Sequence, residues 1–468
     1  MRLRTLLGYA SGSALSAILS FATLPALAWS FSQEDIGKLV MLQVACSLMA
    51  VVFSLGLDQS YVREFNEVED KYGLAKICLL PGLVLLACVC CLIAYFHQSA
   101  GMFFFGIDSR GYFYLALAGC FALYLERFFS VFIRMQEWAV AYSVTKVFPK
   151  LFFLSFVLCA YFYLQFQSLQ TLLFMQVLSW FLAIAVMSVF LAQVLKRAMT
   201  AQLPFKGLRP LLSFGLPLVL NGIAFWGLTY VDRLMLAHYA SFADVGLYAI
   251  AAGFAGVAML FQQIFSTVWH PTIYRWVAEG VQLERVCTVS AVLQLISFLL
   301  IALVGSFAWL LPYFLPQDYF AVEFIIAACM IQPLFLMISE VSGIGISVSR
   351  ATKYLPAVTV AALIVNIGLN VWLIPLFGAG GAAVATAVST GIYLLFKTEL
   401  SWRLWCTQPT ARLYLSMMLT LTGCIVQALA ITENTVYYMV MWSSFAVFLL
   451  YLYRDVLPKL KELKHGIF

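Results

Sequence analysis

Charged side chains are scarce in this sequence: Asp, Glu, Lys and Arg make up 10% of its 468 residues, whereas soluble domains contain about 25%. Hydrophobic residues make up 64%, and the mean hydropathy is +0.97. No soluble fold hides that much apolar surface. No stretch of about 50 residues, the size at which domains usually begin, lacks an apolar run, which excludes a separate soluble catalytic domain.

Arrangements of side chains suited to metal binding are also lacking. Of eleven cysteines, most lie in apolar runs, and we interpret them as reduced and structural. Cys88, Cys90 and Cys91 have His97 nearby but no metal-ligand spacing. We therefore expect no metal and no other cofactor. The net charge of +6 comes from basic residues that mark loops, so it predicts no nucleic-acid partner.

Long apolar runs are what the sequence contains instead. A helix needs about 20 apolar residues to cross a bilayer, and the runs show none of the strict alternation of barrel strands. We therefore predict an all-α polytopic membrane protein with about 14 transmembrane helices. The expected segments are 8–30, 36–60, 76–96, 112–134, 145–164, 170–195, 212–238, 243–268, 287–314, 321–345, 355–375, 380–400, 411–431 and 434–454.

The basic residues predict the orientation of these segments. If the N-terminus is cytoplasmic, nearly all of the 27 Lys and Arg residues fall in inner segments, and the outer loops hold only Lys38 and Arg110. This asymmetry obeys the positive-inside rule. It favours an even number of spans, with both termini on the cytoplasmic side of the membrane.

One loop pattern occurs twice, 209 residues apart. The first copy contains Ser32, Asp35 and Gly37, and the second contains Ser241, Asp244 and Gly246 at the same spacing. Each copy precedes an apolar segment that ends in an aromatic and basic cluster. Six segments separate the copies, an even number, so both have one orientation. Two parallel halves related by an axis along the membrane normal are therefore expected, as in many transporters.

Several short motifs carry a family resemblance. They are Gly56-Leu-Asp-Gln-Ser-Tyr-Val-Arg-Glu64, Phe214-Gly-Leu-Pro217, Tyr230-Val-Asp-Arg-Leu-Met-Leu236, Val245-Gly-Leu-Tyr248 and Ile374-Pro-Leu-Phe-Gly-Ala-Gly-Gly-Ala-Ala383. In their order and spacing, the chain resembles the polysaccharide or O-antigen (Wzx-type) flippases of the multidrug/oligosaccharidyl-lipid/polysaccharide exporter superfamily.

The resemblance implies two pseudo-symmetric six-helix lobes around a central cavity that opens alternately to either side of the membrane. Residues 1–197 would form the N-lobe, 198–405 the C-lobe, and 406–468 two additional helices and a cytoplasmic tail. The implied cargo is a polyprenyl-diphosphate-linked oligosaccharide repeat unit, which moves from the cytoplasmic to the periplasmic leaflet. Membrane lipid is a further partner, and a partnership with polymerase or chain-length machinery stays open.

Charged residues inside the apolar segments are the candidates for function, because each costs about 2.5–3.5 kcal/mol on insertion scales. Adjacent residues on a helix point about 100° apart. We therefore expect no self-neutralisation within the pairs Glu126–Arg127 and Asp232–Arg233. The charged residues that lie within or at the ends of apolar segments are Asp58, Glu126, Arg127, Asp232, Arg233 and Glu340.

Arginine suits the diphosphate of such a cargo, because a guanidinium binds phosphate oxygens bidentately and stays charged. Arg127 and Arg233 are the candidates, and Arg134, Lys146 and Lys150 would form a cytoplasmic entrance. An alternative is that each arginine pairs with an acid only to fix helix packing. Asn366 and Asn370, four residues apart, could hydrogen-bond sugars or join neighbouring helices.

Carboxylates could couple export to a gradient of H⁺ or Na⁺. Burial raises the pKa of an acid, so that it can take up a proton on one side and release it on the other. Asp232, Glu126, Glu340 and Asp58 are the ion-coupling candidates. For Asp58 and Glu340 the alternative is simple solvation at a helix end, and for Asp232 it is a structural ion pair.

Two other functions compete with a flippase. A multidrug or organic-cation antiporter of the same superfamily would need a more acidic cavity. A membrane enzyme of surface-polysaccharide assembly, such as a polymerase or ligase, would resemble its relatives in carrying a long outer loop, and the outer loops here are short. We therefore predict a transporter and not an enzyme.

Overall fold

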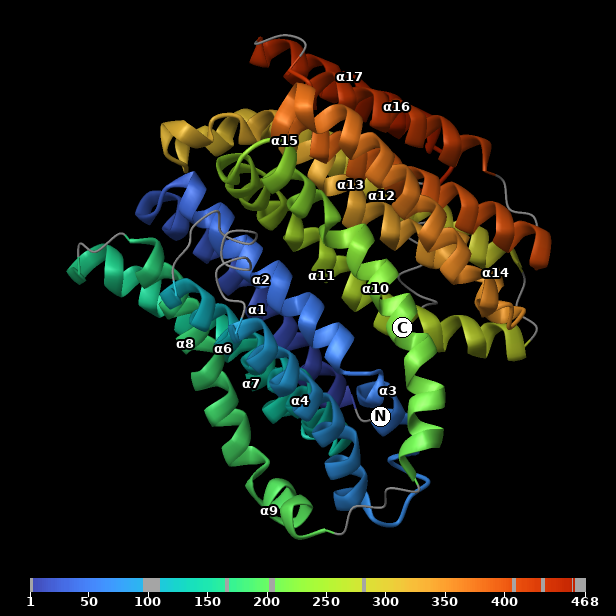
Figure 1. The fold of residues 1–468 in the computed structure, drawn as a ribbon. Helices are drawn as coiled ribbons and strands as arrows, with labels where there is room; N and C mark the ends of the chain where they lie inside the picture. Colours follow the sequence, from blue (N-terminus) through green and yellow to red (C-terminus); the bar gives the residue numbers. More distant parts are fainter. Residues whose placement is uncertain are drawn as a thin grey trace. The chain divides into compact units, whose positions relative to one another are not determined.

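Helices make up nearly all of the computed structural model (Figure 1), which describes residues 3–95, 110–164, 168–201, 207–279, 283–405, 410–430, 434–456 and 458. No strand occurs in these ranges, which confirms the prediction of an all-α protein. The chain divides into two compact units, Met1–Tyr230 and Val231–Phe468.

The first unit is built mainly from α1, α2, α4, α6, α7 and α8, with short helices between them. α1 packs along α7, while α6 packs on α2 and α8. Its elements are α1 (Leu3–Ser30), α2 (Gln33–Phe53), α3 (Leu57–Glu64), α4 (Lys71–Tyr95), α6 (Arg110–Met135), α7 (Ala139–Cys159) with the π-helical turn η1 (Ala160–Leu164), α8 (Leu169–Phe190), α9 (Ala192–Thr200) and the first part of α10 (Leu208–Tyr239).

The second unit has α13 at its centre. This helix is buried along most of its length and packs on α11, α12, α15 and α16. The elements that follow α10 are α11 (Phe242–Ala278), α12 (Leu283–Phe307), η3 (Ala308–Tyr313), η4 (Gln317–Tyr319), α13 (Val322–Ser342), α14 (Gly345–Val348), η5 (Thr352–Tyr354), α15 (Leu355–Leu404), α16 (Ala411–Ala428) and α17 (Thr435–Leu452).

Thirteen helices in the described ranges are long and apolar enough to cross a membrane. One of them, α15, has 50 residues; at 1.5 Å per residue it would extend about 75 Å, against about 30 Å of hydrocarbon. Gly378 interrupts it with non-helical backbone angles, φ 51° and ψ −128°. α15 therefore contains both predicted segments, 355–375 and 380–400, and the chain is a multi-pass membrane protein with about 14 spans.

The two copies of the repeated loop form the same helix cap. The Ser32 hydroxyl accepts the N–H of Asp35 at 3.1 Å and donates to its carboxylate at 2.7 Å. Ser241 does the same with Asp244, at 3.1 and 2.6 Å. Such a cap satisfies an N–H group that the first helical turn leaves unbonded. The sequence repeat is therefore also a repeat of local structure, at the starts of α2 and α11.

A left-handed turn separates α2 from α3. Leu55 and Gly56 have φ angles of 52° and 67°, so the segment predicted as one helix over 36–60 is two helices, and that prediction is wrong. A Cβ on Gly56 would lie 2.1 Å from the carbonyl oxygen of Gly215. The turn thus approaches α10 closely, and two of the family motifs pack against each other there.

The last two helices belong to the second unit, where α16 and α17 lie along α12 and α13 (Figure 1). Trp442 of α17 is 1% exposed, and its ring lies against Gly305 and Gly423. Its indole N–H donates to Gln427 at 2.7 Å. This buried contact holds α17 to α12 and α16.

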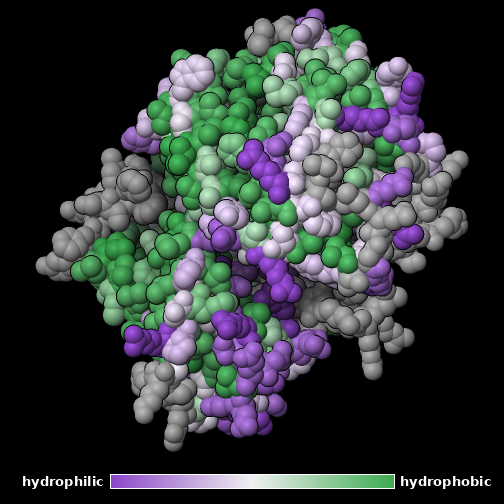
Figure 2. Space-filling model, turned by 90° about the vertical axis from the view of Figure 1, so that its right-hand side faces the viewer, coloured by the Kyte–Doolittle hydropathy of each residue, from purple (hydrophilic) through white to green (hydrophobic). Residues whose placement is uncertain are grey.

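The surface is largely apolar, as expected for helices that face lipid. Figure 2 shows broad hydrophobic areas on one face, with hydrophilic residues gathered in patches between them. Large side chains such as Ile18, Phe162 and Trp372 are more than half exposed. Burying them all inside the protein is unnecessary when hydrocarbon surrounds it.

Candidate functional site

The first charged centre joins α3 to α6. Two guanidinium nitrogens of Arg127, Nε and Nη2, lie 3.0 and 2.8 Å from the same carboxylate oxygen of Asp58. Asp58 is 1% exposed, because the turn at Gly56 directs α3 back into the unit. The interpretation of Asp58 as a solvated helix-end residue is therefore wrong. Arg127 forms an ion pair with an acid of another helix, which is the alternative given for it in the sequence analysis.

The pair is asymmetric in a way that matters for ligand binding. Asp58 Oδ2 also accepts the amide of Gln59 at 2.9 Å, while Oδ1 is buried without a hydrogen-bond partner among the described residues. The Arg127 side chain, in contrast, keeps 34% of its surface exposed. The arginine can therefore contact a further anion while the aspartate holds it in place.

The three basic residues predicted to form an entrance lie on α6 and α7. Lys146 and Lys150 of α7 are exposed, and both act electrostatically on Glu126, the residue preceding Arg127. Arg134 is exposed in the last turn of α6. The structure thus brings Glu126 near the two lysines, and the expectation that it does not neutralise Arg127 agrees with the ion pair that Arg127 forms with Asp58.

The second charged centre lies in the second unit around Asp232, which is 1% exposed. Arg233 donates to Asp232 Oδ1 from Nη1 at 2.9 Å and from its backbone N–H at 2.8 Å. The prediction that these neighbours do not neutralise each other is wrong, because the long arginine side chain folds back along the helix. The other oxygen, Oδ2, accepts hydroxyls of Tyr248 and Thr386.

The predicted sugar-binding asparagines belong to this same network. Asn366 donates to Thr386 at 3.4 Å and to Ser389 at 3.2 Å, and Asn370 donates to Asn366 at 2.9 Å. Both asparagines are 0% exposed. Of the two roles left open for them, the geometry favours hydrogen bonding inside the unit, where they fix the hydroxyl that binds Asp232.

A third cluster surrounds Glu340 of α13. His270 Nε2 of α11 lies 3.2 Å from one carboxylate oxygen, and Lys397 Nζ of α15 lies 3.7 Å from the other. Lys397 also donates to Ser339 at 3.1 Å. The interpretation of Glu340 as simply solvated is therefore wrong: the acid joins three helices.

The surroundings of His270 favour its charged form. Its hydrogen bond to the Glu340 carboxylate raises the pKa of His270 above the usual value of about 6.5, and a bond from Nδ1 to the Ser266 carbonyl adds to the effect, while partial burial opposes it. Charge at this position therefore persists at a higher pH than for a free imidazole.

Sequence reasoning missed the partners of these acids. Tyr248 lies in one of the family motifs, and Thr386 stands in an apolar run beside Ser389 and Thr390, a polar spacing that could have drawn notice. His270 carried no comparable signal. Across the part of the chain that the structure describes, no three His, Cys, Asp or Glu side chains are grouped to hold a metal ion.

The chain matches one protein family and two curated relatives. The family described as "polysaccharide biosynthesis protein" matches residues 3–277. "Lsg locus putative protein 1" of Haemophilus influenzae is 24% identical, over 80% of this chain and 93% of that protein. "Probable low-salt glycan biosynthesis flippase Agl15" of Haloferax volcanii is 23% identical, over 43% of this chain and 46% of that protein.

Solved structures share the fold at low sequence identity. A lipid II flippase MurJ in an inward closed conformation has a TM-score of 0.65 at 14% identity, over 98% of this chain and 99% of that one. An inward-facing multidrug resistance MATE transporter of the MOP superfamily has a TM-score of 0.54 at 14% identity, over 86% and 96%. The fold is therefore that of the superfamily which the motifs resemble.

Proposed function

The chain belongs to the polysaccharide biosynthesis protein family, and we propose that it is a flippase for a polyprenyl-diphosphate-linked oligosaccharide repeat unit. It moves this cargo from the cytoplasmic to the periplasmic leaflet of a bacterial inner membrane by alternating access, with both termini cytoplasmic. This proposal is supported by the family match, by the fold shared with a lipid II flippase and by the similarity to the probable glycan biosynthesis flippase of Haloferax volcanii.

The observation that carries the proposal is the exposed face of Arg127. A charged side chain within a membrane-spanning helix costs free energy unless it pairs with an opposite charge or faces an aqueous cavity. Asp58 is the opposite charge, with its Oδ2 2.8 Å from Arg127 Nη2. The remaining exposure of 34% is what a diphosphate needs, because a guanidinium can bind one anion while presenting further donors to another.

The basic side chains of α6 and α7 form the approach to Arg127. Arg134, Lys146 and Lys150 are exposed and attract the diphosphate before it reaches the buried pair. Arg233 has a smaller part in this proposal, since its charge is already bound to Asp232 and its side chain is only 14% exposed.

Asp232 is the centre through which we propose that export is coupled to H⁺ or Na⁺. Its carboxylate is buried and receives Arg233, Tyr248 and Thr386 from three helices. Protonation or cation binding at Asp232 would exchange these contacts, which gives α10, α11 and α15 two alternative arrangements. Glu340, Glu126 and Asp58 are the other candidates for ion coupling in this proposal.

The experiment that tests cargo binding removes the Arg127 charge without stranding Asp58. Arg127→Gln with Asp58→Asn leaves no unpaired buried charge. In proteoliposomes with a fluorescent polyprenyl-diphosphate oligosaccharide, flipping should fall about tenfold or more, while the amount of folded protein is unchanged. In cells the variant should cause loss of surface glycan and accumulation of the lipid-linked unit.

The matched control changes an ion pair elsewhere. Arg412 and Asp455 lie 2.7 Å apart and are both about half exposed, so Arg412→Gln with Asp455→Asn removes the same two charges and should flip normally. Full flipping by the Arg127 variant would reject the assignment. Coupling is tested separately: Asp232→Asn should remove the dependence of flipping on an imposed H⁺ or Na⁺ gradient.

A multidrug exporter is the second candidate, favoured by the fold shared with a multidrug resistance transporter. It predicts saturable binding of a cationic dye to the purified protein, prevented by Asp232→Asn. Dye binding without flipping of the lipid-linked oligosaccharide would replace the first proposal with this one.

A further inference from the structure

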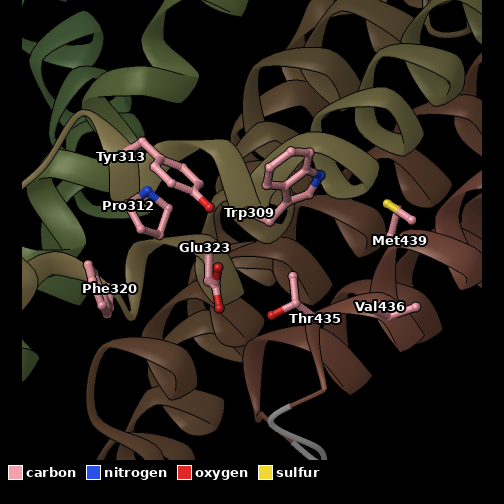
Figure 3. Close-up of a pocket in the computed structure, with 8 residues that line it drawn as sticks. All are labelled: Trp309, Pro312, Tyr313, Phe320, Glu323, Thr435, Val436 and Met439. Carbon is pink, nitrogen blue, oxygen red and sulfur yellow. The ribbon is translucent and has the colours of Figure 1, made fainter.

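A cavity of about 560 Å³ lies in the second unit, and its lining includes none of the residues of the three charged clusters. It is formed where η3, the start of α13 and the start of α17 meet (Figure 3). The lining includes Trp309, Tyr313, Phe320 and Glu323. One carboxylate thus stands among three aromatic rings, in a space large enough for a small polar headgroup.

The charge of Glu323 has no counterion there. Within the ranges that the structure describes, no Lys, Arg or His lies within ion-pair distance of its carboxylate. Its backbone carbonyl accepts the side-chain amide of Gln427 at 2.9 Å, which fixes the first turn of α13 and hence the position of the acid. A half-buried carboxylate attracts a cation, and aromatic faces attract the same charge.

Two hydroxyl groups of the cavity face this carboxylate. In the view of Figure 3 the hydroxyl of Tyr313 points toward Glu323 from above and that of Thr435 from the right. A primary ammonium group has three N–H donors, and the carboxylate and the two hydroxyls offer it three acceptors. A quaternary ammonium has no such donors, and a neutral sugar leaves the carboxylate without a counterion.

The cavity lies at the ends of membrane-spanning segments, which is the level at which a bilayer has its headgroups. Its walls are the ends of three membrane-spanning segments, Glu284–Tyr313, Val322–Ser342 and Thr435–Leu452. Two lining residues, Tyr313 and Val436, are 77% and 60% exposed. Aromatic residues concentrate at this level of a bilayer, and beside Val436 the apolar flank of α17 can receive acyl chains.

We propose that this cavity is a binding site for a phospholipid whose headgroup ends in a primary ammonium, the ethanolamine class. The ammonium binds Glu323, Tyr313 and Thr435 beneath the rings of Trp309 and Phe320. The acyl chains lie along α17. Neither the cargo nor the coupling ion of the proposed function occupies this site.

The test measures lipid selectivity of the full chain by native mass spectrometry. The probes are dioleoyl-phosphatidylethanolamine, dioleoyl-phosphatidylcholine and dioleoyl-phosphatidylglycerol. Phosphatidylethanolamine should bind about tenfold more tightly than either of the others. Glu323→Gln should remove this preference, whereas Glu67→Gln, which makes the same charge change in an exposed loop of the first unit, should keep it.

A second variant keeps the proposal testable if Glu323→Gln folds poorly. Val436→Trp leaves the acid in place but fills the mouth of the cavity, and it should also abolish the preference. Equal binding of all three lipids would overturn the proposal. The aromatic residues of the cavity would then be ordinary members of the aromatic belt at the membrane interface. Displacement of phosphatidylethanolamine by glucose, or a preference that survives both variants, would overturn it as well.

Discussion

The two intramembrane arginines differ in what a second anion would have to displace. Arg233 bonds to Asp232 and lies over the Tyr248 ring at 5.2 Å, so an incoming phosphate would compete with both contacts. Arg127 shares one oxygen of Asp58 and remains a third exposed. Because the Arg127 side chain is more exposed than that of Arg233, at 34% against 14%, our proposal places cargo binding at Arg127.

His270 leads to a prediction about pH. Its pKa is raised in the folded protein by the hydrogen bond to Glu340, so the stabilisation is fully present below the unfolded value of about 6.5 and is lost as pH rises through the folded pKa. The melting temperature in detergent should therefore fall from pH 6.5 upward. His270→Gln should flatten this part of the profile, and an unchanged slope would contradict the argument.

Gly56 leads to a prediction about backbone geometry. Alanine there costs about 1–2 kcal/mol for its left-handed backbone and adds the 2.1 Å contact with the Gly215 carbonyl. Gly56→Ala should therefore lower the unfolding free energy by more than the backbone cost alone. The control is Gly256→Ala, where a Cβ meets nothing within 4 Å. Similar melting temperatures for the two variants would refute the close approach.

The positions of isolated charges in apolar segments could be read from the sequence, but the partners of those charges could not. Isolated charges stand out in apolar runs because hydrocarbon penalises them. Arg127 and Asp58, however, are 69 residues apart, and Thr386 and Asp232 are 154 apart, so only tertiary packing joins them. The prediction that Asp232 and Arg233 do not pair was wrong for another reason. The angle of about 100° between neighbours describes the directions of their Cβ atoms, whereas the long arginine side chain can bend back to the aspartate.

At the scale of elements, span positions could be predicted closely because bilayer thickness sets helix length. The departures occur where backbone geometry intervenes. α2 ends early at the left-handed turn of Leu55 and Gly56, and α11 continues to Ala278, beyond its apolar run, where it supplies His270. Neither an αL turn nor a polar helical extension is visible in an apolar-run analysis.

The attachment of α17 leads to an element-scale prediction. Trp442 is 1% exposed and packs on Gly305 and Gly423. Trp442→Ala therefore leaves a cavity and removes the indole donor from the side-chain oxygen of Gln427, at a cost of about 3–5 kcal/mol. Trp372→Ala, at a position 66% exposed, is the matched control. Equal stability of the two variants in detergent unfolding would show that α17 is not fixed by this contact.

At the scale of the whole molecule, the helix cap formed at Ser32 and again at Ser241 is a local structure that the two predicted halves have in common. The predicted lobes, 1–197 and 198–405 with 406–468 added, remain a prediction, as does the cavity between them. Within Val231–Phe468, the contacts of α16 and α17 with α12, α13 and α15 make the two added helices an integral part of that unit.

The orientation of the whole chain depends on α15, because counting it as one span or two changes the parity of all spans. Gly378 divides its 50 residues into two segments, each long enough for one crossing. Alkaline phosphatase reports periplasmic positions because it is active only there. A fusion after residue 378 should therefore be about tenfold more active than fusions after Ser349 and Leu404. A single crossing would instead put Ser349 and Leu404 on opposite sides, so an active fusion after Leu404 would exclude fourteen spans and a cytoplasmic C-terminus together.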